Sequence, residues 1–208
     1  MLDYERPLYE RGFHSIAGCD EAGRGPLCGP VVCAACILPE NYENPEIDDS
    51  KKLTDKKRRE LFDVIRRDAI AYAVVEISPQ EIDRINIYEA SRKGMQDALS
   101  ALKVKPDYIL TDAMPLHLFD ELPKEALIKG DARSINIAAA SILAKVTRDR
   151  IMEELDRIYP QYELAKHKGY PTKRHLALLE QYGPVKEIYR FTYGPVKRLA
   201  YRQLTLEI

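Results

Sequence analysis

Apolar residues gather in short blocks along the first third of this chain, as is typical of buried β-strands. Three such blocks predict three strands, at residues 14–20, 31–38 and 71–77. Between the second and third blocks, Leu61, Phe62 and Ile65 share one face of a helical repeat that begins at Thr54 and runs to about Ala69. The chain therefore begins with three strands, the last of which follows a helix.

Beyond residue 78 predicted strands alternate with predicted helices. Ser78-Pro-Gln-Glu81 has the form of a capping box, and a helical pattern with a break near Asn86 continues to Leu102. Further strands are predicted at residues 108–111 and 126–129 and further helices at 135–158 and 172–182, whereas residues 183–208 look less regular. This order indicates an α/β fold with a mixed β-sheet flanked by helices.

Length and composition indicate one globular body with a small addition at its C-terminal end. Of the 208 residues, 45% are hydrophobic and 31% are charged, which is enough for a real core. We expect a catalytic domain over residues 1–160 and a basic helical segment over 161–208, packed together or separately. No segment is long and apolar enough to span a bilayer, and the charged start lacks the apolar stretch of a signal peptide, so we expect a cytoplasmic monomer.

Charge is distributed unevenly along the chain. The formal net charge is −1, but the segment from Lys166 to Arg202 holds nine Lys or Arg against two Glu, a net charge of +7. A basic segment on an acidic body fits a surface that faces a polyanion, and it fits a solvated face that aids solubility equally well.

The four cysteines lie between Cys19 and Cys36, and Cys33 and Cys36 form a Cys-x-x-Cys pair. A zinc site is one interpretation of this pair, but no second pair accompanies it. Positions three apart in a strand also point to opposite faces, so packing as small core residues is favoured.

Acidic residues mark the ends of three predicted strands. Asp20, Asp112 and Asp131 each lie at or just beyond the carboxyl end of a strand, where ligand crevices form in open α/β sheets, and Glu21 adds a fourth acid. Asp is also a common turn residue at such ends, and strand alternation can point Asp20 and Glu21 apart. Clustered carboxylates persist more easily around a divalent cation, and oxygen ligands favour Mg²⁺ or Mn²⁺.

A glycine-rich turn directly follows the first two acids. The turn Gly23-Arg24-Gly25 lets another backbone approach closely and puts a guanidinium beside it. Two cations held by the acids would activate a water and stabilise the leaving oxygen of a phosphodiester. The acids and the turn together indicate a metal-dependent site that faces a phosphate-bearing polymer.

Six segments carry a resemblance to a known family. They are Asp20-Glu-Ala-Gly-Arg-Gly-Pro26, Asp49-Ser-Lys-Lys-Leu-Thr54, Asn86-Ile-Tyr-Glu-Ala-Ser91, Thr111-Asp112, the stretch from Gly130-Asp131 into residues 137–146, and His167-Lys-Gly-Tyr-Pro-Thr172. In this order they resemble the motifs of ribonuclease HII, the type 2 ribonuclease H family, over nearly the whole chain. The resemblance implies a ribonuclease H-like fold with a small C-terminal helical addition.

The resemblance also implies an activity and roles for the site residues. It implies an endonuclease that hydrolyses the RNA strand of RNA–DNA hybrids, leaves 5′-phosphomonoesters, and nicks 5′ of single ribonucleotides in duplex DNA during ribonucleotide removal and repair. The catalytic carboxylates, which would bind two Mg²⁺ or Mn²⁺ ions, are then Asp20, Glu21, Asp112 and Asp131. The implied substrate contacts are Gly23, Arg24 and Gly25 at the 2′-hydroxyl and backbone of the junction, Tyr170 stacked on the neighbouring deoxyribose, and Lys51, Lys52 and Lys145 as candidate phosphate contacts. His167 is a candidate for ordering its loop or assisting product release.

The chain departs from the family pattern near its C-terminal end. Tyr189-Arg-Phe-Thr-Tyr193 stands where the family more usually has a histidine-arginine start and a serine-phenylalanine end. The tail, residues 203–208, lacks the paired aromatic residues of a sliding-clamp-binding peptide, so we expect no clamp contact through it. Two other hypotheses remain: a non-catalytic nucleic-acid-binding module, suggested by the basic segment, and a zinc-stabilised structural protein, suggested by Cys33 and Cys36.

Overall fold

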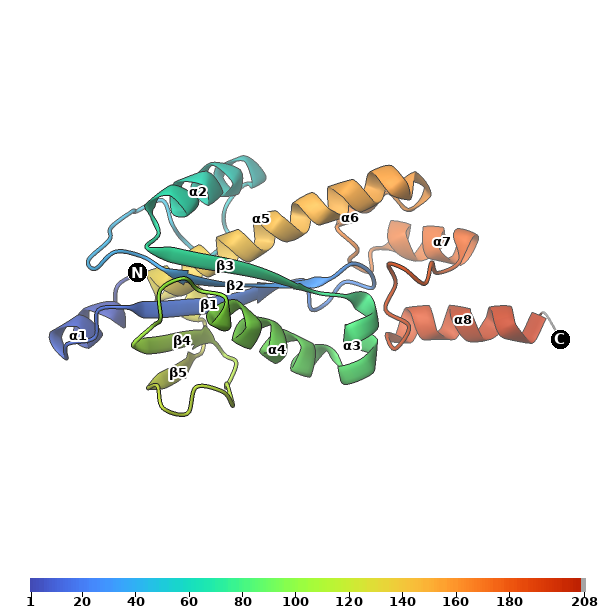
Figure 1. The fold of residues 1–208 in the computed structure, drawn as a ribbon. Coiled ribbons are helices and arrows are strands. Elements are labelled where there is room, and N and C mark those ends of the chain that lie inside the picture. Colours follow the sequence, from blue (N-terminus) through green and yellow to red (C-terminus); the bar gives the residue numbers. More distant parts are fainter. Residues whose placement is uncertain (207–208) are drawn as a thin grey trace.

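A five-stranded sheet forms the centre of the structure, a computed structural model that describes the backbone of residues 1–206 and the side chains of residues 1–201 (Figure 1). The strands are β1 (Ile16–Ala22), β2 (Val31–Ile37), β3 (Ala71–Ile77), β4 (Tyr108–Asp112) and β5 (Lys124–Leu127). The helices are α1 (Glu5–Glu10), α2 (Asp55–Asp68), α3 (Pro79–Ile85), α4 (Ile87–Ser100), α5 (Ile135–Ile158), α6 (Leu164–His167), α7 (Lys173–Tyr182) and α8 (Gly194–Leu206), with short 3₁₀ turns η1 (Gly130–Ala132) and η2 (Pro160–Tyr162).

The sheet is mixed, as the sequence predicts. Its strand order is β3-β2-β1-β4-β5; β1, β2 and β3 pair antiparallel, whereas β1, β4 and β5 pair parallel. Strand β1 therefore lies at the centre, with an antiparallel neighbour on one side and a parallel neighbour on the other. The carboxyl ends of the three parallel strands meet at one edge of the sheet, as expected for such pairing.

Helices cover both faces of the sheet. Helices α2 and α5 lie over one face and α4 over the other, while α7 and α8 extend the molecule at the end opposite α1 (Figure 1). Successive side chains of β2 point to opposite faces of the sheet and so contribute to both cores. Val32 and Ala34 pack in the core under α5, whereas Cys33 and Ala35 pack in the core under α4.

A glycine brings the long helix against the central strand. A Cβ atom at Gly18 of β1 would lie 2.2 Å from the backbone carbonyl carbon of Asn136, so no larger residue fits there. Glu5, fully buried in α1, stabilises the start of the same helix by accepting hydrogen bonds from Ser134 Oγ (2.6 Å) and Asn136 N (3.2 Å). These contacts fix the first turn of α5 close to β1.

The structure corrects several predicted boundaries. Strand β1 includes both Asp20 and Glu21 because its antiparallel pairing with β2 continues to Ala22, although its parallel pairing with β4 stops at Cys19. Strand β5 ends at Leu127, before Lys129, whose φ of +56° breaks the strand. Asp131 consequently lies in the turn η1, and does not directly follow a strand.

The two ends of the chain are more helical than predicted. Helix α1 was not among the predicted elements, and residues 194–206 form α8 where a less regular tail was expected. Helix α8 is held by Val196, which is fully buried in a separate apolar cluster with Leu179 and Tyr162. The loop predicted at residues 166–171 begins two residues later, at Lys168, since α6 extends to His167. Across the described residues, no helix is long and apolar enough to cross a membrane.

Candidate active site

Three carboxylates converge at the edge where β1, β4 and the turn η1 meet. Asp20, Asp112 and Asp131 each offer an oxygen atom, and these three oxygens lie within 4.8 Å of one another. Asp112 Oδ1 accepts a hydrogen bond of 2.8 Å from Gly130 N, which ties the end of β4 to the turn that carries Asp131. The residues predicted from strand ends thus form one cluster, although two lie at positions other than those expected.

The cluster holds negative charge in a poorly solvated place. Burial raises the pKa of Asp20 well above its usual range, and the charges of Glu21 and Asp112 add to the effect. Burial likewise raises the pKa of Asp112, helped by the charge of Asp131 and opposed by the hydrogen bond from Gly130. Such repulsion disfavours the fully ionised cluster unless a cation neutralises it.

Glu21 lies beside the cluster and faces the same pocket. One oxygen, Oε1, is 3.5 Å from Arg24 Nη1, and the other, Oε2, is buried without a hydrogen-bond partner among the described residues. Burial raises the pKa of this carboxyl, while the Arg24 charge partly opposes the shift. Glu21 is not one of the three residues whose oxygens converge, so its Oε2 is a buried acceptor outside that cluster, without a donor among the described residues.

These oxygen atoms suit a hard divalent cation. Carboxylate oxygens from Asp20, Asp112 and Asp131 converge, and no described residue donates to the buried Glu21 Oε2. Oxygen-only ligands are those that Mg²⁺ and Mn²⁺ prefer. The donor set therefore fits the cation chemistry expected from the sequence.

The candidate lysines are placed differently from one another. Lys51 Nζ lies 3.1 Å from Asp131 Oδ2, so this lysine contacts the cluster directly while its side chain remains 75% exposed. Lys145 lines the same pocket but donates to Asp149 Oδ1 at 2.7 Å. Lys52 is exposed and pairs with Asp48. Of the three lysines, only Lys51 contacts a member of the carboxylate cluster among the described residues.

Two buried arginines that were not predicted from the sequence fix the backbone around the Gly-Arg-Gly turn, and one of them, Arg190, bonds to the turn itself. Arg190 donates to the carbonyl oxygens of Gly23 (2.7 Å), Arg24 (3.0 Å) and Gly29 (2.8 Å). Arg148 donates to further carbonyls, those of Cys28, Pro30 and Lys168. Among the described residues neither guanidinium forms an ion pair, and burial lowers the pKa of Arg148 to about 10. Both arginines therefore serve to fix backbone.

The sequence pattern around Arg148 indicates that this arginine is buried. Arg148 stands between Ala144 and Met152 at spacings of four, on the face of α5 that is buried throughout. A charged residue at an apolar helical position predicts a buried partner. Gly23, with φ of +100°, leaves the space for it, because a Cβ there would lie 2.0 Å from Arg148 Nε.

Tyr170 lies next to the same turn. A Cβ at Gly25 would be 3.5 Å from Tyr170 Cε1, and the tyrosine is 44% exposed. Gly169 O accepts from Leu27 N (2.9 Å), which ties the two loops together. His167 makes its contacts within its own loop and with neighbouring elements: it accepts from Gly169 N, contacts Tyr162 O, and stacks on His175 with ring centroids 4.2 Å apart. The structure supports a loop-ordering position for His167.

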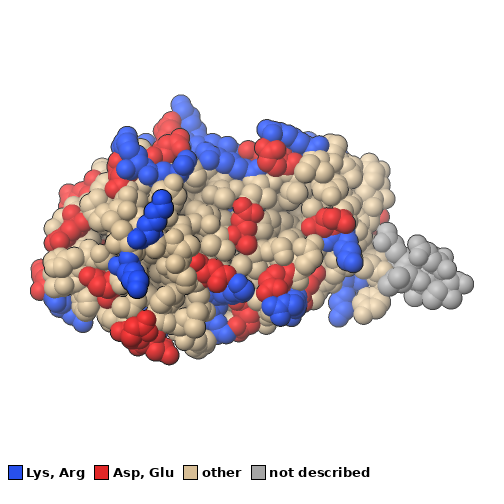
Figure 2. Space-filling model, viewed as in Figure 1, with Lys and Arg blue, Asp and Glu red and all other residues tan. Residues whose placement is uncertain are grey.

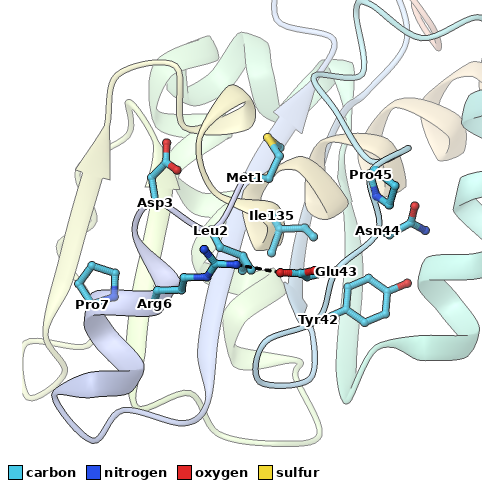
Figure 3. Close-up of a pocket in the computed structure, with 10 residues that line it drawn as sticks. All are labelled: Met1, Leu2, Asp3, Arg6, Pro7, Tyr42, Glu43, Asn44, Pro45 and Ile135. Atoms are coloured by element: carbon cyan, nitrogen blue, oxygen red, sulfur yellow. Dashed lines mark hydrogen bonds and ion pairs between the residues drawn. The ribbon is translucent and has the colours of Figure 1, made fainter.

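One pocket of about 220 Å³ collects these groups. Its lining includes Asp20, Glu21 and Asp112, the turn from Gly23 to Gly25, and Tyr170. A larger pocket, about 560 Å³, lies beside the start of α5 and shares no lining residue with it (Figure 3). Arg6 and Glu43 form an ion pair across that larger pocket, and the carboxylate cluster is not part of it. The chemistry therefore belongs to the smaller pocket.

Surface charge is more mixed than the sequence suggests. Acidic and basic side chains alternate over the face in Figure 2, including the region of the C-terminal helices. Within the basic segment, Lys166 and Arg174 pair with Glu163, and Arg190 is fully buried. The count of +7 thus overstates the free positive charge available there.

The cysteine pair does not form a metal site. All four cysteines are free and buried, and Cys33 and Cys36 pack in the two cores on opposite faces of the sheet. Burial raises the pKa of both thiols, which favours the uncharged form. The zinc hypothesis therefore has no geometric support.

Comparisons with known proteins agree with this geometry. The ribonuclease HII of Bacillus cytotoxicus is 50% identical over 98% of this chain and 78% of its own length. The crystal structure of ribonuclease H2 from Pyrococcus horikoshii OT3 superposes with a TM-score of 0.80 at 32% identity, covering 90% of this chain and 98% of that one. The RNase HII of Archaeoglobus fulgidus, solved in complex with PCNA, gives a TM-score of 0.71 at 27% identity and covers 86% and 95%.

The family assignment follows from the sequence as a whole. The sequence model of the family described as Ribonuclease HII matches residues 17–195, which include all four predicted carboxylates, the Gly-Arg-Gly turn and Tyr170. Together with the mixed sheet and the related structures, this match shows that the chain belongs to the ribonuclease HII family of hydrolytic nucleases.

Proposed function

We propose that this enzyme, a ribonuclease H that acts on RNA–DNA hybrids, also nicks duplex DNA on the 5′ side of single embedded ribonucleotides. One observation carries the proposal: Asp20 and Asp112 of the carboxylate cluster, together with Glu21, line the same pocket as the Gly-Arg-Gly turn and the exposed Tyr170. A group suited to phosphodiester chemistry thus lies beside groups suited to telling ribose from deoxyribose. In the cell this activity would serve ribonucleotide removal and repair.

The four carboxylates would hold the catalytic cations. Asp20, Asp112 and Asp131 converge on one position, and Glu21 Oε2 offers an acceptor for a neighbouring one. We assign two Mg²⁺ or Mn²⁺ ions to this site. When bound, such ions supply an activated water and charge stabilisation at the leaving oxygen, which leaves a 5′-phosphomonoester.

The neighbouring residues would bind and orient the substrate. The backbone of Gly23 and Gly25 can approach a 2′-hydroxyl closely because no Cβ intervenes, and Arg24 offers a guanidinium to the adjacent phosphate. The Tyr170 ring would lie against the deoxyribose that follows, where an added hydroxyl would be crowded. Lys51 and Lys145 at the pocket rim would contact phosphates.

The direct test uses a DNA duplex that carries one ribonucleotide. With Mg²⁺ or Mn²⁺ present, the protein should cut once, 5′ of that ribonucleotide, and Asp112→Asn should abolish cutting while binding survives. The matched control is Asp120→Asn, which removes an exposed carboxylate far along the surface loop and should cut normally. Binding without any cutting by the wild-type protein would favour the non-catalytic binding module instead.

Tyr170 is tested by separating its ring from its hydroxyl. If the ring stacks on deoxyribose, Tyr170→Phe should keep most single-ribonucleotide cleavage and Tyr170→Ala should lose it. Equal activity of all three proteins would remove Tyr170 from the recognition site. Affinity for the duplex should also fall steeply with salt, as contacts to phosphates require.

Two further proposals concern organisation. We propose a catalytic domain over residues 1–160 and a C-terminal segment over residues 161–208 that differ in function but pack together. Arg190 of the segment donates to the Arg24 carbonyl of the domain, and Arg148 of the domain donates to the Lys168 carbonyl of the segment. We also propose that the tail makes no sliding-clamp contact, although the Archaeoglobus relative was solved with PCNA. The side chains of residues 203–208 lie outside the described part of the chain; a clamp pull-down with and without these residues tests the proposal.

A further inference from the structure

The segment Tyr189–Tyr193, where the chain departs from the family pattern, touches both substrate-facing parts of the pocket. At one end, the Tyr193 hydroxyl donates to the carbonyl oxygen of Arg24 at 2.6 Å and accepts from Arg190 Nη1 at 3.0 Å. A phenylalanine at position 193 would keep the ring and lose both bonds. The hydroxyl therefore adds a hydrogen bond to the middle residue of the Gly-Arg-Gly turn.

The other end of the segment reaches the Tyr170 loop through one histidine. Tyr189 Oη lies 2.9 Å from His175 Nε2, and His175 Nδ1 lies 2.9 Å from the carbonyl oxygen of Tyr170. Because that carbonyl can only accept, His175 Nδ1 carries the hydrogen, and Nε2 accepts from the Tyr189 hydroxyl. Tyr189 thereby selects the tautomer of His175 that holds the Tyr170 backbone.

The segment between these two contacts is firmly anchored. Asp83 of α3 accepts from Phe191 N (2.6 Å), Thr192 N (2.9 Å) and Thr192 Oγ1 (2.6 Å). Tyr189 and Arg190 are fully buried, with the Tyr189 ring edge-on to Tyr162 at 5.3 Å between centroids. A rigid segment that holds two loops fixes their separation.

We propose that the hydroxyl groups of Tyr189 and Tyr193 are positioning groups that set the spacing between the Gly-Arg-Gly turn and Tyr170. This proposal rests on the proposed recognition of a ribose followed by a deoxyribose. The spacing then determines how strongly the enzyme prefers a single ribonucleotide over a continuous RNA strand. A continuous RNA strand does not place a deoxyribose against Tyr170, so it depends less on that spacing. Neither hydroxyl takes part in the chemical step.

The activity test compares two substrates in the same variants. Tyr189→Phe, which loses one hydrogen bond, and Tyr193→Phe, which loses two, should each lower the ratio of kcat/KM for a single-ribonucleotide duplex to that for a uniform RNA–DNA hybrid by about threefold to tenfold. Tyr189→His, which keeps a hydrogen-bonding ring beside His175, should restore most of the ratio. The control is Tyr182→Phe, since the Tyr182 hydroxyl makes no hydrogen bond to any described residue and its ring also packs on Tyr162.

A second readout needs no substrate. The Leu27 amide donates to Gly169 O and the Thr172 amide donates to Tyr170 O, so hydrogen exchange at these amides reports on the two loops. Tyr193→Phe should speed exchange at Leu27, and Tyr189→Phe should speed exchange at Thr172, whereas Tyr182→Phe should change neither.

The two readouts separate the possible failures. Unchanged exchange in both tyrosine variants would overturn the positioning role, whatever the activity. Faster exchange with an unchanged substrate ratio would overturn the link to substrate preference. A wild-type protein that cleaves hybrids but never single ribonucleotides would overturn the proposed function itself, and the exchange experiment would still decide whether the hydroxyls hold the loops.

Discussion

Replacing Asp112 by asparagine removes one negative charge from the carboxylate cluster and keeps an acceptor for the hydrogen bond from Gly130 N. Two unit charges at the upper limit of the oxygen separations, 4.8 Å, repel by about 3 kcal/mol at an effective dielectric constant near 20, and by about 1 kcal/mol in bulk water. Lys51 offsets part of this repulsion through its contact with Asp131. We therefore expect the metal-free variant to be more stable than the wild type by about 1–3 kcal/mol.

The sign of this effect depends on pH in a defined way. Burial and the neighbouring charge raise the pKa of Asp112 above its ordinary value of 3.8, so ionisation of this group weakens the fold. The cost develops as the pH rises from 3.8 through the raised pKa and is absent below 3.8. The gain from Asp112→Asn should accordingly be full near neutral pH and vanish in acid.

Urea unfolding in EDTA measures this difference directly. The control Asp120→Asn, at an 86% exposed side chain, should stay within about 0.5 kcal/mol of the wild type. Saturating Mg²⁺ should then stabilise the wild type by about 2.7 kcal/mol at a hundred times its dissociation constant, and the variant much less. A metal-free Asp112→Asn protein that is less stable than the wild type near neutral pH would refute the claim that the cluster is strained by its own charge.

Three further predictions concern Glu5, Gly23 and Arg190. Burial raises the pKa of Glu5, so the wild type should lose stability relative to Glu5→Gln as the pH rises above 4.5, and thermal unfolding across pH should show the gap closing below 4.5. Gly23→Ala should lower the free energy of unfolding by at least about 1–3 kcal/mol and impair cleavage, because of its φ of +100° and its contact with Arg148; unchanged urea midpoints would contradict this. Arg190→Lys, which cannot reach three carbonyls at once, should cost about 2–3 kcal/mol in the same assay, while the exposed Arg198→Lys should cost nothing measurable.

Local patterns predicted the elements that are most completely buried. The strands around Asp20 and Asp112 and the helix that starts after Ser134 were recognisable because their apolar and small residues form continuous blocks. The same patterns could not show that β1 continues through Glu21, since that depends on antiparallel pairing with a later strand. Helix α8 was missed because its stability comes from contacts of Val196 with distant residues.

The candidate site was predictable in its residue types more than in its geometry. Motif resemblance identified the four acids, and strand ends suggested that three of them meet. The turn that carries Asp131 toward Asp20 and Asp112 depends on the left-handed backbone conformation of Lys129, which could not be predicted from the sequence. Arg190 was counted as surface charge because a single arginine among aromatic residues looks solvent-facing until its carbonyl acceptors are known.

The anchoring of the Gly-Arg-Gly turn by Arg190 has a consequence for protein synthesis. Residues 20–25 leave the ribosome early, but the guanidinium that holds their carbonyls belongs to residue 190 of 208. During translation the carboxylates of β1 therefore exist long before the neighbouring turn acquires its final support. The hydrogen bonds that Arg190 donates to the carbonyls of Gly23 and Arg24 can form only after residue 190 has been synthesised, so ordering of this turn trails synthesis of the neighbouring carboxylates.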